Sequence, residues 1–179
     1  TTAVAAGPEA GRNLKIGIVE PRTGALAAHG IGVKYALDRF PRVVPDGIVC
    51  ADGKKRQVEL IPQDTQSDSN RSAQVTADLI QLEKVDVICS GGAPDTYIPS
   101  AEVCESMGCP SLSNAGPWQA FIFGRKAPAE GFKWTYANLV GSEQTVACFI
   151  DMFNQVPNNK LVGMLVKNDA EGNAWVGPR

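Results

Sequence analysis

The stretch that decides the fold runs from residue 58 to residue 96 and reads VELIPQDTQSDSNRSAQVTADLIQLEKVDVICSGGAPDT. It holds two short apolar runs, 58–62 and 85–89, that are rich in Val and Ile, as buried strands are. Between them apolar residues recur at helical spacing as far as Lys84, after a Ser67–Asp68 or Ser69 start that suits a helix cap. The stretch therefore predicts a strand, a helix and a second strand.

The same alternation continues on both sides of this stretch. Residues 14–19 (LKIGIV) predict another buried strand, and residues 25–40 predict a helix that Pro41 ends. Residues 43–56 indicate a loop or hairpin, because they contain Pro-Asp-Gly and Asp-Gly. Pro94 opens a further helix to residue 107, and a fourth strand follows at 109–113. We therefore expect an α/β fold: a doubly wound lobe with a mostly parallel sheet in the flavodoxin-type strand order 2-1-3-4.

After Asn114 the alternation changes. Residues 118–131 are aromatic and loop-like, and 132–136 are strand-like. A helix at 143–153 and a strand at 160–166 then begin a second α/β unit, but one such step cannot enclose a core. The sequence therefore predicts three parts. Residues 1–13 are a flexible tail, residues 14–137 are a first α/β lobe that includes the strand at 132–136, and residues 138–179 are the incomplete beginning of a second lobe.

Composition and charge exclude several classes of function. The 179 residues are 44% hydrophobic, and 17 basic residues against 19 acidic ones leave a charge of −2, so no nucleic-acid partner is expected. No apolar run is long enough to cross a membrane, and no signal peptide is recognisable. The five cysteines form no Cys-x-x-Cys pair and the single histidine is remote from them, so we expect no metal site. Cys104 and Cys109 flank a helix end and could form a disulfide or remain buried thiols.

Motifs for catalysis are also missing. No Gly-x-Gly-x-x-Gly follows the first strand, and no Gly-x-Ser-x-Gly elbow occurs. We therefore expect no catalytic residues and no cofactor, although a small-molecule α/β enzyme remains the alternative from another functional class.

Ligands of open α/β sheets bind beyond the carboxyl ends of the strands. The loop at 90–96 is the most informative there, because its two glycines let a ligand approach and Pro94 starts a helix whose free N–H groups favour an anion. Arg22 is the only cation in these loops and could pair with a ligand carboxylate, or equally with Glu20 or Asp64. Trp118 could stack on a ligand or belong to the core.

Five segments, in order, resemble the type I periplasmic binding protein family. They are LKIGIVEPRTGALAAHG (14–30), the stretch 58–96 quoted above, GCPSLSNAGPWQAFIF (108–123), GFKWTYANLVGSEQTVACFI (131–150) and KLVGMLVKNDAEGNAWV (160–176). In this resemblance the fourth segment is the hinge strand that enters the second lobe. Each segment is weakly diagnostic alone, but the ordered set covers nearly everything after residue 13.

The resemblance implies an extracytoplasmic solute-binding receptor of an ABC importer, of the branched-chain amino acid/amide (Leu/Ile/Val-binding) type. Such a receptor is periplasmic or extracellular, closes two lobes on a small solute, and delivers it to a membrane permease. An extracellular sensor domain of the same fold is an alternative. Positions that hold a ligand's carboxylate and amine in the family correspond here to Ala93, Pro94, Asp95, Thr96, Ser113, Asn114 and Ala115. Ala93 and Pro94 replace a hydroxyl residue of amino acid binders, so amides and aromatic or other organic acids remain open as ligands.

Overall fold

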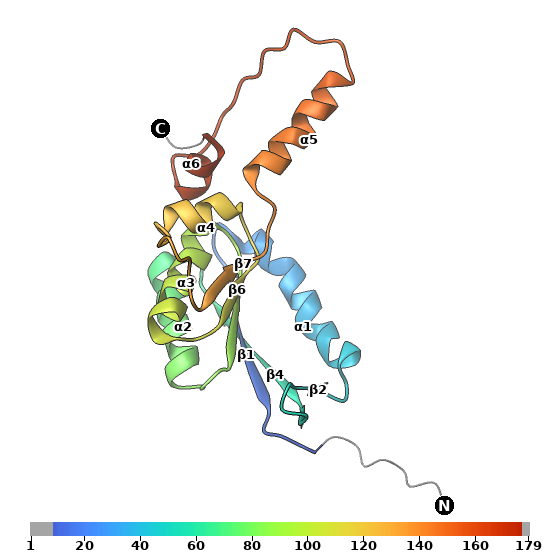
Figure 1. Cartoon of the computed structure of the whole chain (residues 1–179), viewed down its shortest axis with the longest axis vertical. Coiled ribbons are helices and arrows are strands. Elements are labelled where there is room, and N and C mark those ends of the chain that lie inside the picture. The colour runs from blue at the N-terminus through green and yellow to red at the C-terminus, as the bar shows by residue number, and fades with distance from the viewer. Residues whose placement is uncertain (1–8, 177–179) are drawn as a thin grey trace, which may run out of the picture.

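The structure, a computed structural model, describes residues 9–176. Most of the predicted tail at 1–13 and the last three residues of the predicted second lobe therefore lie outside the described part of the chain. The described residues form a layered α/β body from which one helix and its following segment project (Figure 1).

A five-stranded sheet forms the middle layer, in the order β4-β1-β5-β6-β7. Every neighbouring pair is parallel. The order confirms the predicted 2-1-3-4 arrangement, and the strand expected at 132–136 adds a fifth member at the edge, beginning later than expected. The strands are β1 (Leu14–Glu20), β4 (Val58–Asp64), β5 (Val87–Ser90), β6 (Ser111–Ser113) and β7 (Thr135–Ala137).

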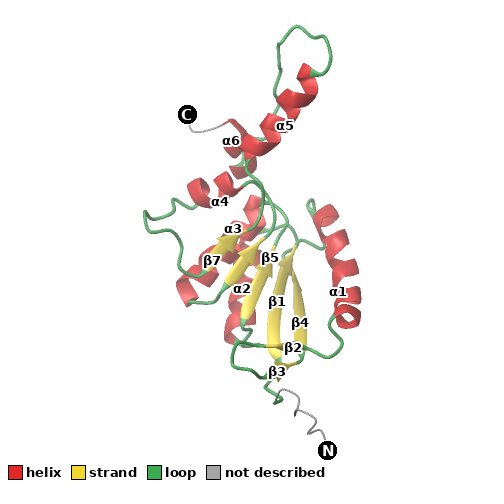
Figure 2. Ribbon diagram, turned by 45° about the vertical axis from the view of Figure 1, so that its right-hand side comes forward, coloured by secondary structure: helices red, strands yellow, loops and turns green. Residues whose placement is uncertain are grey.

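Helices cover both faces of the sheet, which confirms the doubly wound fold (Figure 2). The short 3-10 helix η1 (Ala27–Gly30) and helix α1 (Ile31–Val43) lie on one face, and α2 (Ser69–Gln81) and α3 (Pro94–Met107) lie side by side on the other. The predicted hairpin is the antiparallel pair β2 (Ile48–Val49) and β3 (Lys55–Arg56). The remaining helices are α4 (Trp118–Gly124), α5 (Ser142–Asn154) and α6 (Ala170–Val176).

The main core lies between the sheet and helices α2 and α3. Leu79 of α2 and Ile88 of β5 are fully buried there. Gly17 of β1 allows this close approach, because a Cβ at that position would lie 2.5 Å from Ile88 Cδ1 and 3.0 Å from Leu79 Cδ1. Burial of such side chains is the main favourable contribution to folding.

The cysteine pair also belongs to this core. Cys104 and Cys109 are buried free thiols on either side of Gly108, whose φ of +68° ends α3 in the left-handed conformation. The Cys109 N–H donates to Cys104 O at 3.0 Å across this turn. Hydrogen bonding between the two thiols raises the pKa of Cys104 and lowers that of Cys109. Of the two possibilities left by the sequence, the structure therefore shows two adjacent buried thiols.

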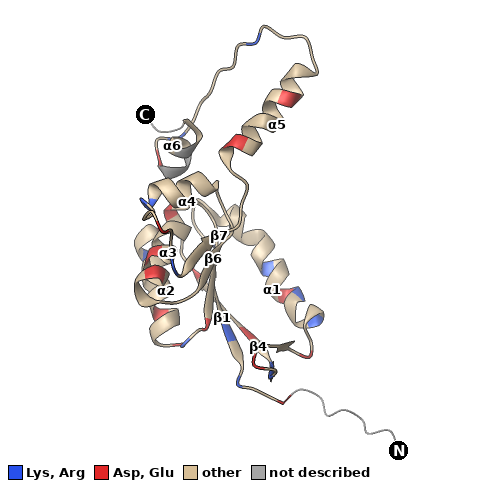
Figure 3. Ribbon diagram, in the orientation of Figure 1, with Lys and Arg blue, Asp and Glu red and all other residues tan. Residues whose placement is uncertain are grey.

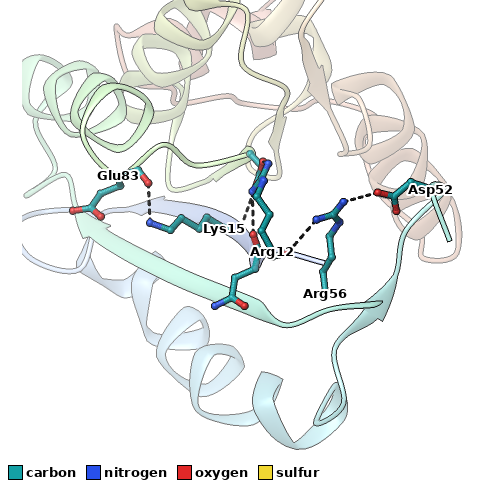
Figure 4. A network of polar contacts seen from close by, with 7 residues as sticks. Arg12, Lys15, Asp52, Arg56 and Glu83 are labelled. Carbon is teal, nitrogen blue, oxygen red and sulfur yellow. Dashed lines mark hydrogen bonds and ion pairs between the residues drawn. The ribbon is translucent and has the colours of Figure 1, made fainter. Parts of the chain in front are cut away.

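Polar contacts fasten the amino end of the sheet (Figure 4). Arg12 pairs with Asp86, which also accepts a hydrogen bond from the Lys15 backbone N–H at 2.9 Å. The Lys15 ammonium donates to the Glu83 carbonyl at 3.0 Å, and Arg56 donates to the Arg12 carbonyl at 3.2 Å. These contacts join the start of β1 to the turn between α2 and β5 and to the hairpin, so they hold the edge opposite to the strands' carboxyl ends.

Two sequence predictions are wrong in this part of the chain. Pro41 does not end its helix, because α1 continues to Val43, and a proline so near the end of a helix removes only one hydrogen bond while its φ remains helical. Residues 118–131 are not all loop, because residues 118–124 form α4. Its Phe121 is 2% exposed and packs on Tyr97 and Phe132, a tertiary contact that local sequence does not reveal.

The strand predicted at 160–166 is also wrong. Residues 161–167 have no regular structure, and Leu165 is 101% exposed. A strand with this apolar composition needs parallel neighbours, and none of the described strands pairs with it. Helix α5, which precedes it, extends away from the sheet (Figure 1).

Two further observations concern charge and helix length. In the view of Figure 3, Lys and Arg and Asp and Glu are spread over several of the elements. Within residues 9–176, no helix combines the length and the apolar character that a bilayer crossing requires.

We predict that Asp68→Ala destabilises the protein by about 1 kcal/mol, because Asp68 is the N-cap of α2 and its side chain accepts the Arg71 N–H at 2.7 Å. Asp78→Ala, an exposed change inside the same helix, is the control and should leave stability unchanged or slightly raised. Urea unfolding of both variants measures the difference, and equal midpoints would contradict the capping role.

We also predict that, in the 179-residue chain, backbone amides at 161–166 exchange with solvent far faster than those of β5. Both edges of β5 are hydrogen-bonded to neighbouring strands, whereas the 161–166 segment has no such pairing. Hydrogen exchange followed by mass spectrometry makes the comparison, and comparable protection of the two segments would disprove it.

Candidate ligand-binding site

A cavity of about 330 Å³ opens at the carboxyl edge of the sheet. It lies where β1 and β5 are neighbours, and the chain leaves these two strands toward helices on opposite faces. Such a switch point is where open α/β sheets bind ligands. The lining residues come from the end of β1, from η1 and α1, and from the loops after β5 and β6: Glu20, His29, Gly32, Val33, Ala36, Gly92, Asn114 and Ala115.

Glu20, the last residue of β1, forms part of the cavity wall and is only 4% exposed. Successive strand side chains alternate, so Glu20 lies on the opposite face from Val19, which is in the core. Among the described residues none donates a hydrogen bond to its carboxylate or forms an ion pair with it, and its oxygen atoms, at the cavity wall, are not among the fully buried polar atoms. Burial raises the pKa of Glu20 to about 7. Burial and the nearby Glu20 charge also raise the pKa of the Cys89 thiol.

Gly91 makes room for this carboxylate. A Cβ at Gly91 would lie 2.3 Å from Glu20 Oε1 and 2.6 Å from Asn114 Oδ1, so any other residue would displace both side chains. An oxygen atom from the end of β1 and one from the loop after β6 therefore lie close together at this edge of the sheet. Both oxygen atoms are hydrogen-bond acceptors for a ligand in the cavity.

Asp64, at the end of β4, shapes the loop that follows β1. Its carboxylate accepts hydrogen bonds from the backbone N–H groups of Arg22 at 2.7 Å and Gln66 at 2.8 Å, and from the Thr23 hydroxyl at 2.7 Å. Partial burial raises the pKa of Asp64, but these hydrogen bonds outweigh it, and the pKa lies below its usual value. Arg22 thus contacts Asp64 through its backbone, while its side chain is exposed and outside the cavity lining.

The loop after β5 is held by Thr96, whose side chain is fully buried. Its Oγ1 lies 3.0 Å from the carbonyl oxygens of Gly91 and Ala93 and accepts the Ala93 N–H at 3.2 Å. Pro94 is buried and Asp95 is exposed. Of this loop only Gly92, with φ of +100°, lines the cavity, so the residues 93–96 set the shape of the loop.

The loop after β6 also contains one residue that holds the structure and others that line the cavity. Ser113 is 1% exposed, and its Oγ lies 3.0 Å from Ser90 Oγ, so the two hydroxyls join the ends of β5 and β6. Asn114 and Ala115 line the cavity. Trp118 begins α4, donates its indole N–H to Glu143 at 2.9 Å, and has its ring next to Phe123.

The structure therefore brings together only two of the residues that the sequence predicted, Asn114 and Ala115. It joins to them Glu20 and His29, which sequence reasoning passed over as ligand-facing groups. A signal for Glu20 existed, because a charged residue ends an otherwise apolar strand directly before the turn. His29 carried no such signal, since only the fold of η1 places it at the cavity.

A larger hollow of about 480 Å³ lies between α5 and the segment that ends in α6. Its walls are mainly apolar, so it lacks the convergent polar groups that orient a solute. We therefore assign the candidate site to the cavity at the sheet edge. The hollow is lined by Thr145, Val146, Phe149, Met164, Leu165, Val166, Lys167, Gly172 and Trp175.

No cluster of three His, Cys, Asp or Glu side chains able to hold a metal ion occurs within residues 9–176.

Several solved structures that share this fold are described as ligand-binding or solute-binding proteins. A solute-binding protein of an ABC transporter from Rhodopseudomonas palustris BisB5, in complex with 3,4-dihydroxy benzoic acid, has a TM-score of 0.71 and 22% identity, over 92% of this chain and 42% of that one. An extracellular ligand-binding receptor from Rhodopseudomonas palustris HaA2 has a TM-score of 0.69 and 17% identity, over 93% and 41%. The leucine binding protein LivK of Thermotoga maritima has a TM-score of 0.63 and 22% identity, over 79% and 37%.

These structural matches establish a shared fold. The chain spans about two fifths of the length of the matched structures. Among curated proteins, no sequence matches the chain closely enough to indicate a relative. A family profile does match: the one described as periplasmic binding protein covers residues 13–176. This match includes every described strand and helix, and it agrees with the parallel sheet and the cavity at its switch point. The chain belongs to the type I periplasmic binding protein family.

Proposed function

We propose that the protein is an extracytoplasmic receptor that binds a small organic solute and delivers it to the membrane permease of an ABC importer of the branched-chain amino acid/amide type. The observation that carries this proposal is the cavity of about 330 Å³ at the β1/β5 switch point, with polar groups converging from the end of β1, from η1 and from the loop after β6. Its size suits a small solute, and its position is that of ligand sites in open α/β sheets.

The class of solute is narrowed by the fold neighbours. One of them is described as a complex with 3,4-dihydroxy benzoic acid, and another as a leucine binding protein. Amino acids, amides and aromatic or other organic acids are therefore the solutes to test first. The neighbours are receptors, which favours binding over catalysis for this chain.

The proposed solute contacts are Asn114, Ala115 and the backbone at Gly92, which line the cavity. We assign Ala93, Pro94, Thr96 and Ser113 to holding the two loops, because the hydroxyls among them are bonded within the protein and Ala93 and Pro94 are buried. Arg22, Asp95 and Trp118 remain proposed contacts from outside the cavity lining. In a receptor of this family a second lobe closes over the solute, and we propose that such closure gives these three residues access to it.

A sensor domain of the same fold is the second candidate function. It would bind solute at the same edge, so the cavity supports both functions equally. A receptor for uptake releases its solute unchanged to a permease, whereas a sensor transmits the lobe closure to a signalling domain. Transport of labelled solute by membrane vesicles, with and without the full-length protein, separates the two.

We predict that the full-length protein binds at least one compound in a calorimetric panel of amino acids, amides and aromatic acids. Asn114→Ala should weaken that binding about fivefold, because one hydrogen bond from the solute is worth about 1 kcal/mol. Asn70→Ala, an exposed change on α2, removes the same amide outside the cavity lining and should leave affinity unchanged.

Two results would contradict this proposal. Equal affinity of wild type and Asn114→Ala, with loss of affinity on changing a residue outside the cavity, would place the site elsewhere. Chemical conversion of the bound compound, followed by mass spectrometry, would show an enzyme.

A further inference from the structure

Glu20 has no structural explanation within the described chain. Its side chain is 4% exposed, yet no described group donates a hydrogen bond to it or forms an ion pair with it. Burying an ionisable group without a partner costs free energy, and buried polar groups in proteins nearly always have a partner. Because this carboxylate also lines the cavity, a bound solute can supply the missing partner.

None of the described groups around Glu20 carries a permanent positive charge. From η1 comes His29, from β5 the Cys89 thiol, and from the loop after β6 the Asn114 amide. Asp64, paired with Glu20 across β1 and β4, is bonded to the Thr23 loop. Helix α1 contributes Gly32, Val33 and Ala36, and none of the described Lys or Arg residues lines the cavity.

We propose that Glu20 receives a hydrogen-bond-donating cationic group of the solute, a primary ammonium, at the end of β1. This inference rests on the proposed receptor function and deepens it, because it makes the solute a cation or a zwitterion whose ammonium points toward β1. The ammonium donates to Glu20 and to the neighbouring Asn114 Oδ1, and both atoms are acceptors close to Gly91.

A solute carboxylate fits this place less well. It would bring a third set of acceptor oxygens beside Glu20 and Asn114, and one of the two carboxyl groups would have to hold a proton. At the α3 N-terminus, which the sequence suggested as an anion site, the Thr96 hydroxyl already accepts the Ala93 N–H, and of that loop Gly92 lines the cavity. The solute's own carboxylate, where it has one, therefore lies away from β1.

The two orientations predict opposite pH dependence. Burial raises the pKa of Glu20 to about 7, so its carboxylate is half ionised near neutral pH. An ammonium stabilises the ionised form, lowers that pKa, and binds more tightly as pH rises through 7. A solute carboxylate accepting the Glu20 proton would raise the pKa and bind less tightly over the same range.

The first test needs no knowledge of the natural solute. Full-length protein labelled with ¹³C at the glutamate carboxyl carbons is titrated with acid and base, alone and with methylammonium, tetramethylammonium or acetate. The Glu20 signal is the one lost in Glu20→Gln, and the exposed Glu59 on β4 is the internal control. Methylammonium should lower the pKa of Glu20 by about one unit, equivalent to a tenfold preference for the ionised form, and leave Glu59 unmoved.

Tetramethylammonium carries the same charge without an N–H donor, so its effect should be clearly smaller. A tetramethylammonium effect as large as that of methylammonium would show simple charge attraction and overturn the hydrogen-bonded site. An unmoved Glu20 signal with methylammonium, or a pKa raised by acetate alone, would overturn the proposal as well.

A stability measurement checks the premise that Glu20 is buried without a partner. Because its folded pKa is raised, its contribution to stability is fully present below the unfolded value near 4.5 and is lost as pH rises through about 7. The melting temperature of the wild type should therefore fall between roughly pH 5 and roughly pH 8, the range over which Glu20 titrates, and Glu20→Gln should make this fall less steep. Glu59→Gln should leave the slope unchanged, and parallel slopes for wild type and Glu20→Gln would overturn the premise.

Calorimetry on a solute found by the panel separates this inference from the receptor proposal. If an anionic solute without an amine binds and its affinity falls as pH rises, the receptor stands and the ammonium site is wrong. If methylammonium moves the Glu20 signal but no panel solute binds, the ammonium site stands and the receptor proposal fails.

Discussion

The pairing of β1 with a parallel strand along each of its edges is the constraint on which the rest of the structure depends. β4 and β5 both align with β1, so the carboxyl ends of all three strands lie at one edge of the sheet. The helices that follow these strands lie on opposite faces of the sheet, and a cavity forms between the connections that lead to them. Gly17 supports this arrangement because its lack of a Cβ lets Leu79 and Ile88 close over β1.

The two edges of the sheet use polar groups in different ways. At the amino edge, charged side chains have partners, as Arg12 has in Asp86. At the carboxyl edge, Asp64 is saturated by hydrogen bonds, whereas Glu20 is buried without a donor among the described residues. A protein loses stability by keeping such a carboxylate at neutral pH. Loss of stability at one position is typical of a functional site, where the missing interaction is made by a ligand.

Most of the first lobe could be predicted because its signals are local. β1, β4 and β5 arise from short apolar runs, α1 and α2 carry apolar residues at helical spacing, and alternation of strand and helix leaves few topologies. The wrong predictions concern segments where distant contacts decide. Phe121 makes α4 a packed helix by contact with Tyr97, and the apolar run at 160–166 stays irregular because no described strand pairs with it.

The sequence by itself determined the strand order, the family and the edge of the sheet at which a ligand binds in such folds. It could not determine which side chains face the cavity, because that depends on the side of each strand or loop that the packed helices leave open. Thr96 and Ser113 look like ligand hydroxyls in the sequence, but they are bonded inside the protein. Glu20 and His29 lie apart in the chain, and only the turn from β1 through η1 brings both to one cavity.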